Sequence, residues 1–254
     1  GAGLVCGSVQ AAYTEGDLGA GNVITLQGKI TNTNTPWSWQ VGSDQKNWNT
    51  TKMEWLVTGA EATADFSGKG NIPVLDGYLT SMVASTVLGM HPVITMSGDG
   101  YKVTAGAGSV EQTAEVTAKG LTDANDPASE VDGKMTFKLV QGAVGVYTGA
   151  DNNVYYLPVT LGGVAAQANT TNSNYRNAVN TANTNMQLAD DWAAGPYTGR
   201  GVNFASSGTA TASLGRKRTY SGFHSNIHST RVTFPAATIP ETWNATLSVV
   251  VAYQ

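Results

Sequence analysis

The fold is decided at the end of the chain, by the stretch Trp243-Asn-Ala-Thr-Leu-Ser-Val-Val-Val-Ala-Tyr253-Gln254. Its apolar residues fall on every second position: Ala245, Leu247, Val249, Val251 and Tyr253. This period places side chains on one face of a β-strand. No residues follow to supply a neighbouring strand, so we expect a segment from another molecule to pair with it. The alternative is a terminal strand that closes a self-contained sandwich.

The composition is typical of an exported, β-rich protein. Only 13% of the 254 residues are charged, and 30 are glycines. A net charge of -4 gives no general attraction to nucleic acid or to anionic membrane surfaces. No apolar stretch is long enough to span a bilayer as a helix. We therefore expect no nucleic-acid partner.

Residues 1–11 predict the remnant of a secretory signal peptide. They are small and uncharged, and Val9-Gln-Ala11 fits the small-residue pattern that precedes a cleavage site. The alternative is an ordinary first strand. Cleavage would start the mature chain at Ala12 and would remove Cys6, the only cysteine. The mature protein could then form no disulfide, and its stability would come from core burial or from a partner strand.

Residues 12–27 predict an arm that becomes a strand only on a template. The arm begins rich in glycine and starts to alternate at Val23-Ile-Thr-Leu-Gln27. Such a segment suits strand donation to another subunit, and a disordered tail is the alternative. Its expected inserting residues are Leu18, Val23, Ile24 and Leu26. The groove that accepts them would be lined by Leu247, Val249, Val251 and Tyr253.

The rest of the chain, 28–254, predicts one antiparallel β-sandwich with extra strands. Many short segments rich in β-branched and aromatic residues are bounded by Gly, Asn, Asp or Pro. They are Gly28-Lys-Ile-Thr, Trp37–Gly42, Met53–Thr58, Leu75–Thr80, Pro92–Met96, Tyr101–Thr104, Val110–Thr117, Met135–Val140 and Tyr155–Leu161. We see no fixed-period repeat, which argues against solenoids and propellers.

An insertion at about 145–200 interrupts the strand pattern. Between Val164 and Trp192 the chain is rich in Asn and Ala, and its apolar residues recur at spacings of three or four, which predicts one or two short helices. Aromatic and amide side chains flank this helical segment, and such a mixture suits a sugar, because C–H faces stack on rings while hydroxyl groups need directional partners. The candidate glycan-binding residues are Asn152, Asn153, Tyr155, Tyr156, Trp192 and Arg200. The same residues also occur in ordinary loops and cores.

The sequence offers little support for catalysis, a metal or a cofactor. His224-Ser-Asn-Ile-His228 has a spacing that could ligate a metal on a helix, but it has no intervening Glu and no third ligand nearby. Gly98-Asp-Gly100 and Gly106-Ala-Gly108 lack the lysine and the helix of a phosphate loop. No Gly-x-Ser-x-Gly motif occurs. We expect no enzyme, no metal site and no cofactor.

Several segments resemble the FaeG-type major fimbrial adhesins of enterotoxigenic Escherichia coli, in the order in which that family has them. They are Tyr13-Thr-Glu-Gly, Gly28-Lys-Ile-Thr, Trp37-Ser-Trp-Gln-Val-Gly42, Thr219-Tyr-Ser-Gly-Phe-His224 and Leu247-Ser-Val-Val-Val-Ala-Tyr253. The resemblance implies an incomplete immunoglobulin-like sandwich that a periplasmic chaperone and an outer-membrane usher assemble into a surface fimbria of identical subunits. It also implies a subdomain at roughly 145–200 that binds a host glycoconjugate.

Three hypotheses follow from the sequence. The first is a structural pilin that also attaches to host glycans, and the second is a purely structural pilus subunit or surface antigen without a glycan site. The third is a secreted β-sandwich hydrolase or free lectin that folds alone. The arm at 12–27 separates the third hypothesis from the others, since a self-sufficient protein has no use for it. Only glycan binding separates the first two.

Overall fold

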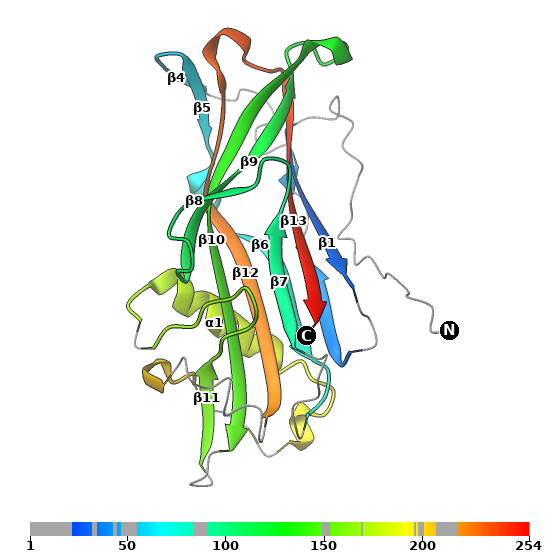
Figure 1. Cartoon of the computed structure of the whole chain (residues 1–254), viewed down its shortest axis with the longest axis vertical. Coiled ribbons are helices and arrows are strands. Elements are labelled where there is room, and N and C mark those ends of the chain that lie inside the picture. Colours follow the sequence, from blue (N-terminus) through cyan, green and yellow to red (C-terminus); the bar gives the residue numbers. More distant parts are fainter. Residues whose placement is uncertain are drawn as a thin grey trace, which may run out of the picture.

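We describe a computed structural model of residues 22–31, 35–42, 45–46, 55–83, 91–148, 153–168, 170–195, 197, 201–206 and 218–253 (Figure 1). The strands are β1 (Asn22–Ile30), β2 (Trp37–Val41), β3 (Gln45–Lys46), β4 (Leu56–Thr58), β5 (Glu61–Asp65), β6 (Ile72–Leu79), β7 (Pro92–Ser97), β8 (Lys102–Ala105), β9 (Glu111–Leu121), β10 (Glu130–Thr148), β11 (Val154–Pro158), β12 (Arg218–Pro235) and β13 (Thr242–Tyr253). The α-helix is α1 (Ser173–Met186), and short 3-10 turns occur at Ser67–Lys69, Pro127–Ser129, Trp192–Ala194, Phe204–Ser206 and Ala236–Thr238.

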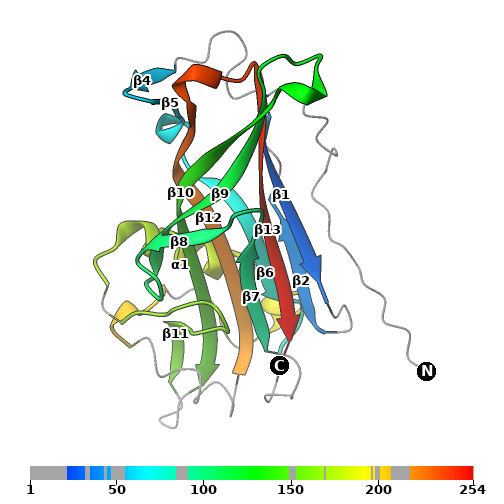
Figure 2. The same ribbon diagram turned by 45° about the horizontal axis from the view of Figure 1, so that its top comes forward.

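Eight of the thirteen described strands form one hydrogen-bonded path in the order β2-β6-β12-β10-β9-β13-β1-β3. The other five pair beside it: β11 with β10, β5 with β12, β4 with β5, β7 with β13 and β8 with β9. The path is curled, so that side chains of β2 and β6 share one core with those of β1 and β13, and Figure 2 shows β2 close to β1. Trp39 on β2, the first strand of the path, donates a hydrogen bond from Nε1 to the Tyr253 hydroxyl on β13, at 2.7 Å, which links two strands that are not neighbours in the path. The predicted all-β, immunoglobulin-like sandwich is confirmed.

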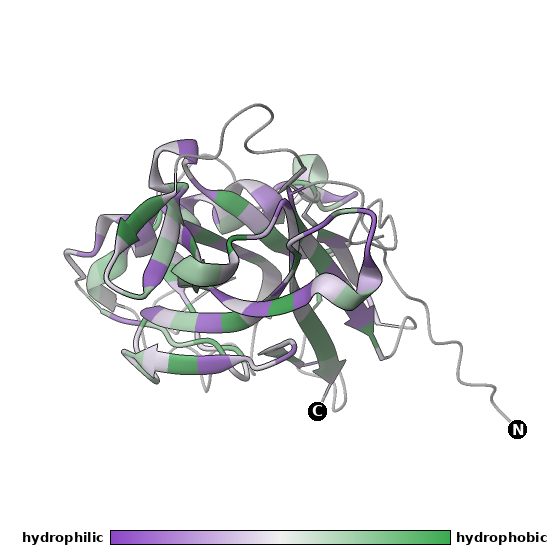
Figure 3. Ribbon diagram, turned by 90° about the horizontal axis from the view of Figure 1, so that it is seen from above, coloured by the Kyte–Doolittle hydropathy of each residue, from purple (hydrophilic) through white to green (hydrophobic). Residues whose placement is uncertain are grey.

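The main core lies inside this sandwich. Along the strands, hydrophobic and hydrophilic residues alternate, as the view from above shows (Figure 3). The largest fully buried side chains include Trp243, Phe137, Phe223 and Phe234. Burying each large apolar side chain contributes about 1.5–3 kcal/mol, so this core supplies most of the stability.

Two long strands form the centre of the sheet. β10 has 19 residues, many more than the predicted Met135–Val140, and β12 has 18 residues and was not predicted; they pair with each other along most of their length. The pairing is interrupted by a bulge at Ser229, whose φ of 53° is left-handed. On the N-terminal side of the bulge β12 pairs with β6, and on the C-terminal side it pairs with β5. The bulge therefore bends β12 from one neighbour to another.

A second core forms where α1 packs on the outer face of β10 and β12. The helix begins at its N-cap Asn172, whose side chain accepts a hydrogen bond from the Tyr175 backbone at 2.9 Å. Its buried face is formed by Tyr175, Ala178, Val179, Ala182 and Met186, as the sequence spacing predicts. Glycines on the two strands let the helix approach closely: a Cβ at Gly142 would lie 2.6 Å from Val179 N, and one at Gly222 would lie 2.1 Å from Ala182 O.

No helix in the described part of the chain is long and apolar enough to cross a membrane. The predicted signal remnant at 1–11 and most of the predicted arm, through residue 21, lie outside the described residues.

Candidate functional site

The last strand, β13, is paired along both edges. On one edge, β9 pairs with Thr242–Ala245 and β7 pairs with Ser248–Tyr253, both antiparallel. On the other edge, β1 runs parallel to β13, from Asn22 beside Trp243 to Ile30 beside Val251. In this structure β1 therefore lies beside β13 of its own chain. The sequence analysis predicted that this position would be filled by the arm of another subunit.

The contact between β1 and β13 is apolar on its inner face. Three of the four expected groove residues are fully buried, and Tyr253 is half-buried: Leu247, Val249, Val251 and Tyr253. Ile24, Leu26 and Ile30 of β1 are buried beside them, with 0–3% of each residue exposed. Gly28 of β1 lies opposite Val249 in the strand register. The inner face of β13 is therefore completed by the chain's first described strand.

Polar side chains join the same two strands on the outer face. Asn244 donates from Nδ2 to Thr25 Oγ1 at 2.9 Å, and Ser248 donates to Gln27 Oε1 at 3.2 Å. Thr31 donates its backbone N–H to Val251 O at 3.0 Å. Of the predicted inserting residues, Val23, Ile24 and Leu26 are thus buried on β1, while Leu18 lies outside the described residues.

Of the four predicted glycan-binding residues that the structure describes, three are buried or half-buried and one is exposed. Tyr156 is only 2% exposed and belongs to the core beneath α1, while Tyr155, its neighbour on β11, packs against the main core. Trp192 is half-buried, with its ring 4.8 Å from that of Tyr220 and 6.5 Å from that of Tyr156, both edge-on. The Tyr156 ring is therefore covered in this structure.

The other three predicted glycan-binding residues are asparagines and an arginine. Asn153 is exposed, and Asn152 and Arg200 lie outside the described residues. Burial raises the pKa of the nearby Tyr220 hydroxyl to about 12, helped by the negative charge of Asp191. Tyr220 therefore stays neutral at physiological pH. The contact between Trp192 and Tyr220 holds the loop after α1 against the sheet.

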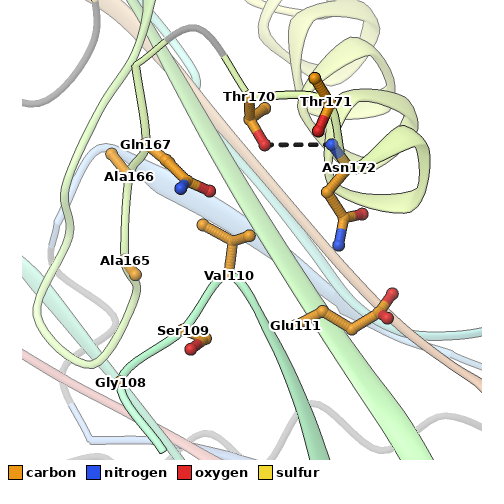
Figure 4. A pocket seen from close by; sticks show the side chains of 10 residues that line it. All are labelled: Gly108, Ser109, Val110, Glu111, Ala165, Ala166, Gln167, Thr170, Thr171 and Asn172. Atoms are coloured by element: carbon orange, nitrogen blue, oxygen red, sulfur yellow. Dashed lines mark hydrogen bonds between the residues drawn. The ribbon is translucent and has the colours of Figure 1, made fainter. Parts of the chain in front are cut away.

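A pocket of about 760 Å³ lies at the other end of the helix. It opens between the turn that joins β8 to β9, the loop before α1, and the N-cap of the helix (Figure 4). Its lining residues are Gly108, Ser109, Val110, Glu111, Ala165, Ala166, Gln167, Thr170, Thr171 and Asn172. Figure 4 shows Asn172 and Glu111 on one side and Gln167 on the other. Most of these side chains are polar and uncharged.

Glu111 holds this wall of the pocket in place. It forms the start of β9, and its Oε2 accepts from Asn174 Nδ2 of α1 at 2.9 Å and lies 3.1 Å from His228 Nε2 of β12. Lys138 Nζ of β10 lies 3.8 Å from Oε1. The carboxylate is therefore surrounded by donors from three elements, which fixes β9 against the helix and the sheet.

The turn and loop that form the pocket are also fixed. Ser109 closes the turn by donating its backbone N–H to Gly106 O at 2.9 Å, and Gly106 and Gly108 have φ values of 70° and 76°. Thr170 accepts from the Asn172 backbone at 3.1 Å, and its carbonyl accepts from Arg176 at 3.2 Å.

The sequence analysis did not identify this site. The paired glycines at 106–108, which require a tight turn, were the available signal.

The two histidines of β12 each contact a different carboxylate. His224 Nδ1 lies 2.7 Å from Asp76 Oδ1 of β6, whereas His228 contacts Glu111. Asn185 of α1 donates to the same Asp76 oxygen at 2.6 Å. Within the described residues, no group of three or more His, Cys, Asp or Glu side chains could hold a metal ion. The histidines thus connect β12 to its neighbouring elements.

Comparison with known proteins identifies the family. The model of the family described as "Fimbrial, major and minor subunit", of the K88 type, matches residues 2–254. No curated protein matches the chain significantly in sequence. The match spans both the sandwich and the insertion with α1 and the pocket, and it agrees with the resemblance that the sequence segments carry. The chain therefore belongs to the K88 (FaeG-type) family of fimbrial subunits.

Proposed function

We propose that this fimbrial subunit polymerises by exchanging its first strand between molecules, and that the resulting fibre attaches to host-cell glycans. Membership of the family makes the chain a subunit of an exported surface fimbria that polymerises with other subunits. Strand exchange explains how the subunits join, and glycan binding explains what the fibre does. The family is structural rather than enzymatic.

The observation that carries the exchange is the pairing of β1 with β13. The buried side chains of β1 complete the main core, yet β1 pairs with β13 alone apart from two residues of β3. It is joined to β2 only through residues 31–36. A strand that supplies core residues from the N-terminal end of the chain, through one short connection, can supply them equally well to a neighbouring subunit.

Exchange also gives a role to a periplasmic chaperone and an outer-membrane usher. With β1 withdrawn, the apolar face of β13 around Leu247, Val249 and Val251 would be open to water. An exposed strand edge of this kind aggregates unless another strand covers it. A chaperone strand would cover the edge during export, and the usher would allow the arm of the next subunit to replace it.

A disulfide that locks β1 onto β13 tests the exchange. Gln27 and Ser248 are paired in the strand register, so Gln27→Cys with Ser248→Cys can form a bond within one chain. In a Cys6→Ser background, we expect the oxidised variant to remain a monomer and the reduced variant to form fibres. Electron microscopy and non-reducing gels would measure both.

A second disulfide provides the control. Lys102→Cys with Glu115→Cys joins β8 to β9, at another paired position far along the sheet from β1. We expect that variant to polymerise whether oxidised or reduced. Fibres formed by subunits whose 27–248 disulfide is intact would show that β1 need not leave β13, and would exclude exchange of this strand.

Glycan attachment is the second part of the proposal, and the polar pocket beside α1 supports it. Both Figure 1 and Figure 2 place β8 and α1 on one flank of the molecule and β1 and β13 on the other. A ligand beside α1 would therefore not obstruct the strands proposed to join subunits. The alternative is a purely structural subunit. Assembled fibres that bind no glycan in any multivalent format would favour that alternative.

A further inference from the structure

We propose that neighbouring subunits of the fibre also touch end to end, through two exposed apolar patches at opposite ends of the sandwich. The β4 patch consists of Leu56 and Val57, and the Met82 patch consists of Met82 and Leu188. In the fibre, the β4 patch of one copy would cover the Met82 patch of the next. This inference rests on the proposed polymerisation by strand exchange, and it adds a second contact beside the exchanged strand.

The two patches contain the large hydrophobic side chains that are exposed among the described residues. Leu56 is 72% exposed on β4, and Leu188 is 58% exposed in the loop after α1. Single apolar residues are ordinary on a protein surface, but these four fall into two pairs. Covering such a pair with another apolar surface removes it from water, which favours association.

The β4 patch is carried by a hairpin that is fixed to the core. β4 pairs with β5, which pairs in turn with Arg231–Pro235 at the end of β12. The Trp55 ring packs edge-on against Phe234, with 6.0 Å between the ring centroids. Leu56 and Val57 lie on opposite faces of β4, yet both are exposed. Within the described residues β4 pairs with β5 alone, and an uncovered apolar edge of this kind favours contact with another molecule.

The Met82 patch is held together by hydrogen bonds between two segments. Asp190, two residues after Leu188, donates its backbone N–H to Thr80 O at 2.8 Å. Met82 donates its own backbone N–H to Asp191 Oδ2 at 3.1 Å. The loop after α1 is thereby fixed beside the residues that follow β6, and the two exposed side chains belong to one surface.

The two patches lie at opposite ends of β12. Thr233 of β12 pairs with β5, whereas Gly222 pairs with Tyr78 near the end of β6. The stretch of β12 between these two positions is roughly 35 Å long, at about 3.3 Å per residue. Figure 1 shows β4 and β5 at one end of the long axis of the molecule. Contacts between unlike ends of identical subunits repeat from copy to copy and extend into a fibre.

The connection to β1 places the Met82 patch at the joint between subunits. Pro36, at the end of that connection, accepts hydrogen bonds from the backbone N–H and the hydroxyl of Thr80, at 2.7 and 3.0 Å. Residues 31–36 can span at most about 20 Å. When β1 is donated, the end that carries Met82 therefore stays close to the subunit that receives the strand. Two identical patches would join subunits only in pairs, so the β4 patch is the proposed partner.

Cross-linking in assembled fibres tests the contact. In a Cys6→Ser background, Val57→Cys with Leu188→Cys places one thiol in each patch, and the fibres are treated with a short bis-maleimide. We expect a ladder of dimers, trimers and longer products on denaturing gels, because each subunit is joined to the next. The matched control is Thr104→Cys with Leu188→Cys. Thr104 is exposed on β8, away from both patches, and we expect no ladder.

A second set of variants tests whether the contact is apolar. Leu56→Lys with Met82→Lys, added to the cysteine pair, places like charges in both patches. We expect the ladder to be lost, while fibres still form through strand exchange. Leu56→Met with Met82→Leu is the conservative control and should keep the ladder. All these positions are exposed, so the substitutions leave the core unchanged.

The outcomes separate this inference from the proposed function. If fibres form and the Val57–Leu188 cysteine pair gives no ladder, the end-to-end contact is wrong, although strand exchange stands. If either single cysteine variant gives cross-linked dimers, like patches meet and the head-to-tail arrangement is wrong. A ladder that survives the lysine substitutions would overturn the apolar contact. Fibres that form with the 27–248 disulfide intact exclude exchange of β1, whatever the ladder shows.

Discussion

At the scale of single residues, Val249 tests the inner face of β13. Its side chain is 1% exposed, whereas Val250 points to the other face and is half-buried. Val249→Asp loses about 1.5–3 kcal/mol of burial and adds an unpaired charge to the core. We expect this variant to be degraded during export and to form no fibre. Val250→Asp should be exported and assembled, and equal fibre yields from the two variants would contradict the assignment.

The sequence alone predicts the inward residues of β13, because apolar residues at every second position of a strand lie on one face, and that face is the buried one. It does not predict which aromatic side chains are exposed. Tyr155 and Tyr156 have the same neighbours in sequence, yet they face different cores on opposite sides of β11. Only the position of α1 decides that Tyr156 is covered, and that position depends on contacts remote in sequence.

At the scale of elements, the glycines under α1 test how the helix is held. A Cβ at Gly222 would overlap the carbonyl of Ala182, so Gly222→Val should force the helix away from β12. We expect destabilisation of about 1–3 kcal/mol, measured by thermal unfolding, together with loss of any binding at the pocket. Gly68→Ala is the control, since no atom lies within 4 Å of its new Cβ. Unchanged melting of Gly222→Val would exclude this close packing.

Element prediction succeeded for α1 and failed for β12. The helix shows clear spacing of its buried residues, and Asn172 marks its start. β12 was not predicted, because its outer face carries Gly222, His224, Asn226 and His228 beneath or beside the helix, and the bulge at Ser229 shifts the alternation. Because β12 buries polar residues against carboxylates and a helix, its sequence shows no alternation of hydrophobic and polar residues.

At the scale of the whole molecule, removal of the first strand tests self-sufficiency. A chain without residues 12–30 lacks the side chains of Ile24, Leu26 and Ile30 that complete the core. We expect it to persist only as a complex with its chaperone and to form no fibre. Moving residues 12–30 to the C-terminus through a linker should restore a stable monomer. Co-purification and size-exclusion chromatography measure both results, and polymerisation of the shortened chain would contradict strand exchange.

The sandwich class is readable from the sequence, whereas the parallel pairing of the first and last strands is not. Turn residues and short apolar segments are local signals, and they predict an antiparallel sandwich. The pairing of Asn22–Ile30 with Trp243–Val251 joins residues from opposite ends of the chain, and no local pattern in either segment gives its parallel direction. The pocket was missed for a similar reason, since the β8–β9 turn and residues 165–172 meet only after folding.

The direction of β1 has a mechanical consequence. Its pairing with β13 extends over the whole of Asn22–Ile30, and the connection to β2 continues from its end. Tension that enters through this connection acts along the strand, at right angles to the hydrogen bonds. All of them are then sheared together instead of being peeled apart one by one. In the proposed exchanged fibre, the pairing of β1 from one subunit with β13 of the next would therefore be loaded along its most resistant direction.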